Sequence, residues 1–143
     1  MKKIKVETTR FGTIEVSRDD VYVFPRGIIG FEPLKRYVIL NSNKGNSILW
    51  LQSVEDPEIA FIISNPKEFI TDYELKIPPS CQLLAGLDVK RTFVFTILYI
   101  DKKKKRLYLN ILAPLLIDPI SKLGIQILTD TPMPTISFPL RQP

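Results

Sequence analysis

The amino-acid sequence predicts an all-β protein: a small antiparallel β-barrel or sandwich of about nine or ten short strands with one short helix. Three observations support this fold class. Short runs of β-branched and aromatic residues recur along the chain, turn signals separate them at intervals of about 8–12 residues, and neighbouring runs can pair as hairpins. No internal repeat or linker interrupts the pattern, so we expect one domain that spans residues 1–143.

The strongest hairpin signal lies near the middle of the chain, in the apolar runs Ile48–Val54 and Ile59–Ser64. Between these runs Pro57 presets φ, and the Asp56 side chain can bond the backbone two residues on, which favours a tight turn. Large apolar side chains, Trp50 among them, alternate onto both faces of the pair. We therefore expect this hairpin to lie centrally in the sheet, covered on both sides.

The chain before this hairpin alternates between strands and turns. Apolar residues occur at every second position in several runs, which predicts half-buried strands at Lys3–Thr8, Thr13–Val16, Val21–Phe24 and Leu34–Leu40. The segment Phe24–Pro33 holds two glycines and two prolines in ten residues, so it cannot form a regular element. We expect a loop with Gly27 or Gly30 at positive φ, anchored by Phe24 and Phe31.

The chain after the central hairpin predicts the one helix and a second hairpin. Alternation predicts a strand at Asp72–Ile77, and Ser80 is placed to cap a short helix at Cys81–Ala85. The runs Thr92–Ile100 and Leu107–Ala113 are rich in β-branched and aromatic residues and form the second hairpin. Two further strands follow at Leu115–Ile117 and Ile125–Leu128, and the prolines after Thr129 impose an extended tail.

Composition narrows the class of protein. The chain carries 20 Lys+Arg against 15 Asp+Glu, a formal net charge of +5. No apolar run approaches the ~18 residues of a membrane span, and the basic start Met1–Glu7 is not followed by the apolar region of a signal peptide. The single cysteine, Cys81, fits a reducing compartment. We therefore expect a cytoplasmic protein with no membrane partner.

Catalytic chemistry is hard to locate in this sequence. There is no histidine, which removes the commonest general base near neutral pH and the commonest metal ligand. The acidic residues lie at turns or alternate with apolar residues, as they do on solvated strand faces. We expect no enzyme activity, no catalytic residues, no cofactor and no metal.

The run Lys102–Arg106 joins the two strands of the second hairpin and is called the basic finger below. Two interpretations remain open. One is a solvated tip whose charges discourage edge-to-edge aggregation; the other is a contact through Lys102, Lys103, Lys104, Lys105 and Arg106 with phosphates or with an acidic partner. We expect the aromatic residues Phe93, Phe95, Tyr99 and Tyr108 to be needed for the core, so nucleic acid is disfavoured as a partner.

Four stretches together resemble one family, the bacterial flagellar assembly factor FliW. They are Phe11–Val16; Phe24–Glu32 with Lys35; Trp50–Pro57 with Ala60 and Phe61; and Leu112–Leu115. The pair Gly124 and Gln126 also matches the late strand of that family. The resemblance implies a β-barrel-like protein without catalytic activity that binds flagellin and holds it soluble before export. It also implies a second partner, the translational repressor CsrA, bound away from its RNA surface, so that free FliW lifts repression of flagellin translation.

A flagellin chaperone must shield an apolar amphipathic segment, which requires an exposed apolar surface. Most apolar residues here lie in alternating strands and are expected in the core. The remaining ones lie in the Gly27–Phe31 loop and in the proline-rich tail. We therefore expect the partner site to be lined by Ile28, Ile29, Phe31, Met133, Ile136, Phe138 and Leu140.

Overall fold

The computed structural model describes residues 2–41, 48–129 and 136–139, which form eleven strands and three short 3₁₀ turns. The strands are β1 (Lys3–Thr8), β2 (Gly12–Ser17), β3 (Tyr22–Val23), β4 (Arg36–Asn41), β5 (Leu49–Ser53), β6 (Ala60–Ser64), β7 (Phe93–Asp101), β8 (Arg106–Leu109), β9 (Leu115–Asp118), β10 (Leu123–Gln126) and β11 (Ile136–Pro139). The turns are η1 (Arg18–Asp20), η2 (Pro66–Glu68) and η3 (Val89–Arg91). The predicted all-β class is confirmed.

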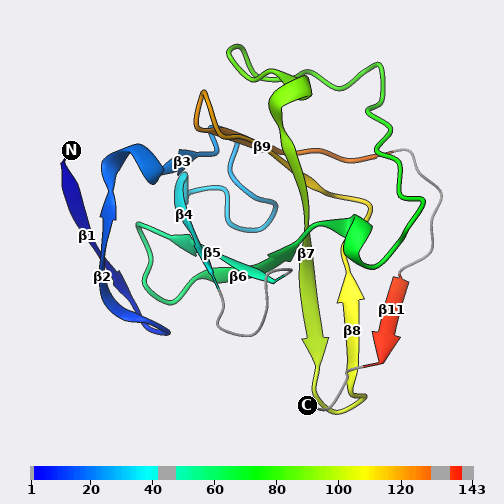
Figure 1. Ribbon diagram of the computed structural model, residues 1–143, viewed down its shortest axis with the longest axis horizontal. Helices are drawn as coiled ribbons and strands as arrows, with labels where there is room; N and C mark the ends of the chain where they lie inside the picture. The colour runs from blue at the N-terminus through cyan, green and yellow to red at the C-terminus, as the bar shows by residue number, and fades with distance from the viewer. Residues whose placement is uncertain (1, 42–47, 130–135, 140–143) are drawn as a thin grey trace.

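A closed barrel occupies the centre of the molecule (Figure 1). Its strands follow the order β7-β6-β5-β4-β3-β10-β9, and a second pairing of β7 with β9 closes the ring. The long strand β7 makes closure possible because different parts of it pair with different strands. Phe93–Phe95 pair with β9, Thr96–Leu98 with β6, and Leu98–Asp101 with β8.

Two smaller sheet segments extend from this barrel. The hairpin β1–β2 forms a separate two-stranded sheet at one side, and the far half of β7 continues with β8 and β11 as a projecting ribbon (Figure 1). Part of the predicted extended tail is thus a strand: β11 pairs with β8 from Ile136 opposite Leu109 to Pro139 opposite Arg106.

The central hairpin forms as predicted, with Leu51 opposite Phe61 and Trp50 opposite Ile62. In its turn the Asp56 carboxylate accepts the Glu58 N–H at 3.0 Å, the contact expected two residues on. Leu51 is fully buried inside the barrel, whereas Trp50 lies half-buried against the β1–β2 hairpin. There the Phe11 ring meets Trp50 edge-on at 5.9 Å and the Arg10 guanidinium lies 4.2 Å from the ring centroid. The outer face of β5 is therefore covered by the N-terminal hairpin, and Trp50 is not part of the barrel core.

The barrel core is formed by alternate residues of the ring strands and by two side chains of the β3–β4 loop. Fully buried side chains from five segments meet there: Phe24, Ile28, Tyr37, Leu51, Ile63, Leu115 and Ile117. A second apolar cluster covers the outer face of β9 and β10, built on Leu116 and Ile125. A third, built on Leu98 and Leu107, covers one face of the β7–β8 ribbon.

The predicted helix at Cys81–Ala85 and the predicted strand at Asp72–Ile77 do not form. Both segments run irregularly over the outer clusters. Leu75, Cys81 and Leu83 pack against the cluster on β9 and β10. A helix of five residues has little stability of its own. An irregular backbone places more of these closely spaced apolar residues on the barrel surface, so tertiary packing determines the conformation.

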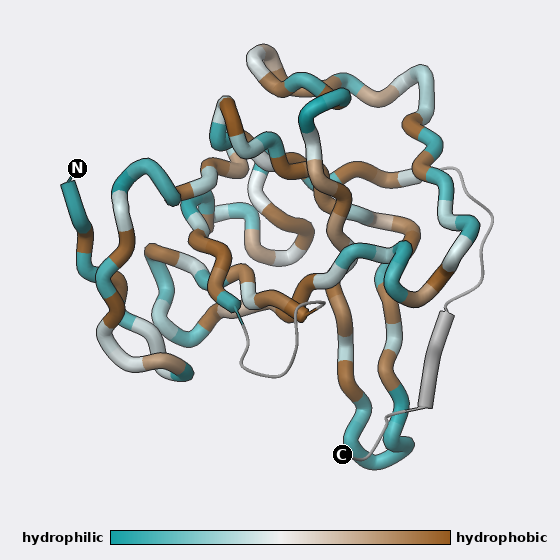
Figure 2. The backbone as a smooth tube through the Cα atoms, viewed as in Figure 1, coloured by the Kyte–Doolittle hydropathy of each residue, from teal (hydrophilic) through white to brown (hydrophobic). Residues whose placement is uncertain are grey.

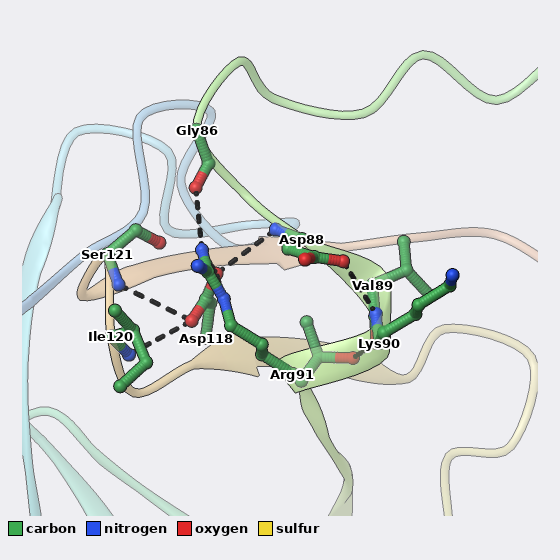
Figure 3. A network of polar contacts seen from close by, with 9 residues as sticks. Gly86, Asp88, Val89, Lys90, Arg91, Asp118, Ile120 and Ser121 are labelled. Carbon is green, nitrogen blue, oxygen red and sulfur yellow. Dashed lines mark hydrogen bonds and ion pairs between the residues drawn. The ribbon is translucent and has the colours of Figure 1, made fainter.

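A buried carboxylate ties the irregular segment to the barrel end (Figure 3). Asp118, at the end of β9, is fully buried and accepts hydrogen bonds from the Arg91 guanidinium at 2.7 Å and from the Asp88 N–H at 3.0 Å. Its other oxygen accepts the Ile120 N–H at 2.9 Å in the β9–β10 turn. One side chain thus fixes both η3 and that turn.

In the described ranges no helix combines the length and the apolar character that a bilayer-spanning segment requires. No group of three His, Cys, Asp or Glu side chains in the same ranges is arranged to hold a metal ion.

Candidate partner-binding surface

The loop between β3 and β4 is held in one conformation by its glycines. Gly27 and Gly30 have φ of +70° and +88°, so positive φ occurs at both predicted positions. A Cβ atom on Gly27 would lie 2.6 Å from the Cα of Glu32, which leaves no room for any other residue. The Phe24 N–H donates to the Lys35 carbonyl at 2.7 Å and closes the base of the loop.

The loop divides its apolar residues between the core and the surface. Ile28 is only 1% exposed and packs inside the barrel, so the expectation that the core leaves this side chain free is wrong. Positive φ at the flanking glycines lets the chain turn inward at Ile28 and outward again. Ile29 is 59% exposed, and Phe31 is half-buried with its ring edge-on to Phe61 at 5.1 Å. Ile29 is therefore the side chain that the loop presents.

The tip of the loop is fastened to β10. Gln126 accepts the Ile29 N–H at 2.8 Å through its side-chain oxygen and donates to the Ala113 carbonyl at 3.1 Å through its side-chain nitrogen. Two residues earlier on the same strand, a Cβ atom on Gly124 would lie 2.4 Å from the Phe24 ring. The two β10 residues that carried part of the family resemblance therefore seat the base and the tip of the loop.

Two further exposed leucines lie close to this anchor. Leu112 is 47% exposed and Leu128 is 65% exposed, and the Thr129 N–H donates to the Leu112 carbonyl at 2.9 Å. Both leucines are within two residues of the Gln126–Ala113 bond. We call Ile29, Leu112 and Leu128 the Ile29 patch. These two leucines were not predicted at the site because each lies within a predicted strand, Leu107–Ala113 or Ile125–Leu128, whose apolar residues were expected in the core.

The carboxylate of Glu32 stiffens the same loop electrostatically. Its own backbone N–H and that of Gly30 donate to it and lower the pKa of the Glu32 carboxyl. The Gly30 bond measures 3.1 Å. Across the barrel rim, the Glu55 carboxylate accepts the Lys35 and Arg36 N–H groups at 2.6 and 2.9 Å, and these bonds lower the pKa of that carboxyl. Both acids remain ionised near neutral pH and hold the second half of the loop, from Gly30 to its junction with β4.

The tail residues that were expected to line the site with the β3–β4 loop lie elsewhere, where the structure describes them. Ile136 and Phe138 occupy register positions opposite Leu109 and Leu107 in β11, which pairs with β8 on the projecting ribbon. The loop contacts β10 instead. Met133 and Leu140 lie outside the described residues.

The basic finger closes the β7–β8 ribbon. Asp101 accepts the N–H groups of Lys103 and Lys104 at 3.0 and 3.1 Å, and Lys105 adopts a φ of 52°. Lys102–Lys105 are exposed, and Figure 2 shows the tip as a hydrophilic end of the ribbon. Beside it Tyr99 is 64% exposed, and Phe93 at the other end of β7 is 57% exposed. The expectation that the core uses all four aromatic residues of this hairpin is wrong for these two, and Tyr108, half-buried beside Tyr99, joins none of the apolar clusters formed by the described residues.

Comparison with known proteins identifies the family. The FliW protein family matches residues 5–140. The chain belongs to the FliW family. Two relatives, each named flagellar assembly factor FliW, cover most of the chain. That of Natranaerobius thermophilus is 34% identical over 141 residues, 96% of this chain and 92% of the relative. That of Caldicellulosiruptor bescii is 37% identical over 134 residues, 91% of this chain and 86% of the relative.

A solved structure agrees with the fold of this FliW chain. A crystal structure of the flagellar assembly factor FliW superposes with a TM-score of 0.79, covering 97% of this chain and 99% of that chain at 23% identity. The family match over residues 5–140 confirms the resemblance read from the sequence, and this structure confirms the fold. In this member of the family the motif residues Phe24, Gly27 and Gly124 act in packing, while the loop tip at Ile29 faces outward.

Proposed function

We propose that this FliW chain is a cytoplasmic flagellar assembly factor that binds flagellin and holds the subunit soluble before export. It acts by binding, without catalysis. The observation that carries the proposal is the family match over residues 5–140, with relatives named flagellar assembly factors. The same proposal includes CsrA as second partner, which the chain binds once flagellin has been exported.

The Ile29 patch supports flagellin as the partner. The family resemblance implies that flagellin has apolar amphipathic terminal segments, and a protein that shields them needs apolar side chains outside its own core. Ile29, Leu112 and Leu128 are exposed, and the loop that carries Ile29 is rigid because Gln126 and two positive-φ glycines hold it. A rigid apolar surface loses little conformational entropy on binding, which favours affinity. Phe31 and the tail residues Met133, Ile136, Phe138 and Leu140 remain proposed contributors.

The net charge of +5 limits which surfaces of this chain and of CsrA can meet. Two proteins with basic surfaces bind poorly through those surfaces because like charges in an interface are unfavourable. The proposed contact lies away from the RNA-binding surface of CsrA, as the family resemblance implies. We therefore propose that CsrA and flagellin compete for the apolar Ile29 patch, and that the basic finger takes no part in either contact.

The test compares two exposed isoleucines. Calorimetric titration with a flagellin C-terminal peptide is carried out on the wild type, on Ile29→Asp, and on the matched control Ile120→Asp, whose isoleucine is 70% exposed in the β9–β10 turn. We expect Ile29→Asp to weaken binding at least about ten-fold and Ile120→Asp to leave it unchanged. Equal affinity of both variants and the wild type would place the contact elsewhere. Purified CsrA, added to the preformed flagellin complex, tests the competition.

A further inference from the structure

The projecting ribbon carries an aromatic pair on a face that the barrel does not use. Tyr99 and Tyr108 are opposite each other in the β7–β8 register, and their ring centroids lie 6.1 Å apart at an interplanar angle of 39°. Tyr99 is 64% exposed and Tyr108 half-buried. The other face of the ribbon holds Leu98 and Leu107, which are buried in an apolar cluster. The tyrosine pair is therefore a surface feature and contributes little to the folding core.

The basic finger lies directly beyond this pair. Tyr99 precedes the last β7 residue, Asp101, by two positions, and Tyr108 follows the first β8 residue, Arg106, by two, a separation of about 7 Å along each strand. Because the Asp101 carboxylate binds the N–H groups of the turn, the tip is ordered and this acid is occupied. Across the described part of the chain, Lys102–Lys105 take part in no salt bridge. Four positive charges are thus presented on a fixed turn beside two aromatic rings.

We propose that the basic finger and the Tyr99–Tyr108 pair bind single-stranded nucleic acid, with lysines on the phosphates and the Tyr99 ring beneath a base. Stacking platforms next to a basic track are the general means by which proteins hold single strands with little sequence preference. A duplex does not fit the same site, because its bases are already stacked and offer no free face along its length. The site lies on the ribbon and does not depend on the Ile29 patch.

The tyrosine exposure distinguishes this ligand from an acidic polypeptide. A chain of carboxylates would be attracted by the lysines, but it has no flat π-surface to place on Tyr99. The sequence alone disfavoured nucleic acid because it assigned these rings to the core. The 64% exposure of Tyr99 removes that objection and leaves the ring available for stacking.

The test measures fluorescence anisotropy of a labelled, unstructured single-stranded RNA of about 12 nucleotides, with DNA of the same sequence, the corresponding duplex, and poly-glutamate as competitors. The wild type is expected to bind RNA and single-stranded DNA, and the logarithm of the binding constant should fall with the logarithm of salt concentration by about 0.7 for each phosphate neutralised. Duplex and poly-glutamate should compete weakly.

Matched variants separate a defined site from bulk charge. Replacing Lys102, Lys103 and Lys104 by Ser should abolish binding, whereas the same change at the exposed Lys2, Lys3 and Lys5 alters net charge equally and should leave binding nearly unchanged. Lys105 is kept in both because of its positive φ. Tyr99→Ala should weaken RNA binding about five-fold or more, and Tyr99→Trp should restore it.

Three results would overturn the proposal. Equal losses in the two lysine triples would mean that only net charge attracts the RNA. Unchanged affinity in Tyr99→Ala, with circular dichroism showing a folded protein, would remove the stacking contact. Competition by poly-glutamate as strong as that by unlabelled RNA would assign the finger to an acidic protein instead.

Discussion

Arg91 and the fully buried Asp118 form a salt bridge of 2.7 Å that joins the irregular segment after residue 70 to the end of β9. Burial alone would raise the pKa of the Asp118 carboxyl. The Arg91 guanidinium and the N–H groups of Asp88 and Ile120 outweigh that effect and hold the pKa well below its usual range. The folded protein therefore stabilises the ionised form of the Asp118 carboxylate.

This relationship predicts how stability depends on acid. A carboxyl with a lowered folded pKa stabilises the fold above its unfolded value of about 3.9, and this contribution is lost as the pH falls toward the folded pKa. We expect the wild-type Tm to fall as the pH drops below about 4. Asp118→Asn should be less stable at pH 7 and should show a shallower decrease in acid. Tm curves for both proteins that run parallel from pH 7 to the acid limit would contradict the assignment.

At Tyr37 we expect stability to be lost at alkaline pH, in contrast to the loss in acid at Asp118. Burial, with a smaller contribution from the charge of Glu55, raises the pKa of Tyr37 to about 12. Because the pKa is higher in the folded protein, Tyr37 contributes its full stabilisation of the fold below the unfolded pKa of about 10. This stabilisation is lost as the pH rises from about 10 toward 12. We expect Tyr37→Phe to lose less stability than the wild type over that range, with the exposed Tyr99→Phe as control.

The same substitution tests packing at neutral pH. The Tyr37 hydroxyl has no hydrogen-bond partner among the described residues, so removing it leaves no group unsatisfied. The ring contact with Phe24 at 5.4 Å is retained in phenylalanine. Urea unfolding of Tyr37→Phe should show a free energy of unfolding equal to, or up to about 1 kcal/mol above, that of the wild type. A free energy of unfolding clearly below that of the wild type would indicate a polar contact at the hydroxyl.

Trp50 is predicted to stabilise the docking of the N-terminal hairpin more than the barrel itself. Trp50→Ala removes the ring contacts with Phe11 and Arg10, but the ring is only half-buried. We expect a decrease of about 2 kcal/mol in the free energy of unfolding, below the ~3–5 kcal/mol of a fully buried tryptophan. Amide exchange should accelerate mainly in β1 and β2. Uniform acceleration over all the barrel strands would show that Trp50 acts in the core.

Local chemistry determined the parts of this fold that the sequence predicted. The Asp56–Glu58 turn, the positive-φ glycines and the alternation in β5 and β6 depend on neighbouring residues, so they can be recognised in a linear sequence. The features that the sequence left open or missed are all long-range. The sequence left a barrel and a sandwich as alternatives, because closure by β7 and β9 depends on which strands meet in space. The irregular course of residues 72–85 and the exposure of Tyr99 also depend on tertiary contacts.

The same reasoning explains the candidate site. Gly27 and Gly30 identified the loop, but alternation cannot show that Ile28 turns inward and Ile29 outward, because the loop has no strand period. The bond from Gln126 to the Ile29 N–H joins residues 97 positions apart. The motif Gly124 and Gln126 was visible in the sequence, whereas its role as the seat of the loop was not.

Gly124 offers a direct test of that seat. A Cβ atom there would overlap the Phe24 ring at 2.4 Å, so Gly124→Ala should lower the free energy of unfolding by about 1–3 kcal/mol through overpacking. The double variant with Phe24→Leu should be less destabilised than the sum of the two single changes, because the smaller side chain frees the space. Additive effects in this double-mutant cycle would mean that the two residues do not compete for the same volume.

The last prediction concerns the fastening of the loop tip. Gln126→Leu removes the bonds to the Ile29 N–H and to the Ala113 carbonyl, while water can replace the partner of the exposed Ile29 amide. We expect a decrease of only about 1 kcal/mol in the free energy of unfolding. The matched control is Gln82→Leu, an exposed glutamine that contacts the loop only through its backbone carbonyl, which accepts the Arg26 guanidinium and is retained in the variant.

The informative measurement for Gln126→Leu is amide hydrogen exchange at Ile29. Exchange there should become faster while the amides of β5 and β6 keep their protection, because the loop loosens without unfolding of the barrel. Binding of a flagellin C-terminal peptide should weaken in the same variant, since a mobile loop must be ordered again on contact. If the Ile29 amide exchanges as slowly as in the wild type, the glycine conformations alone hold the loop. The hydrogen bond from the Ile29 N–H to Gln126 would then form because the loop already lies there, and would not itself hold the loop.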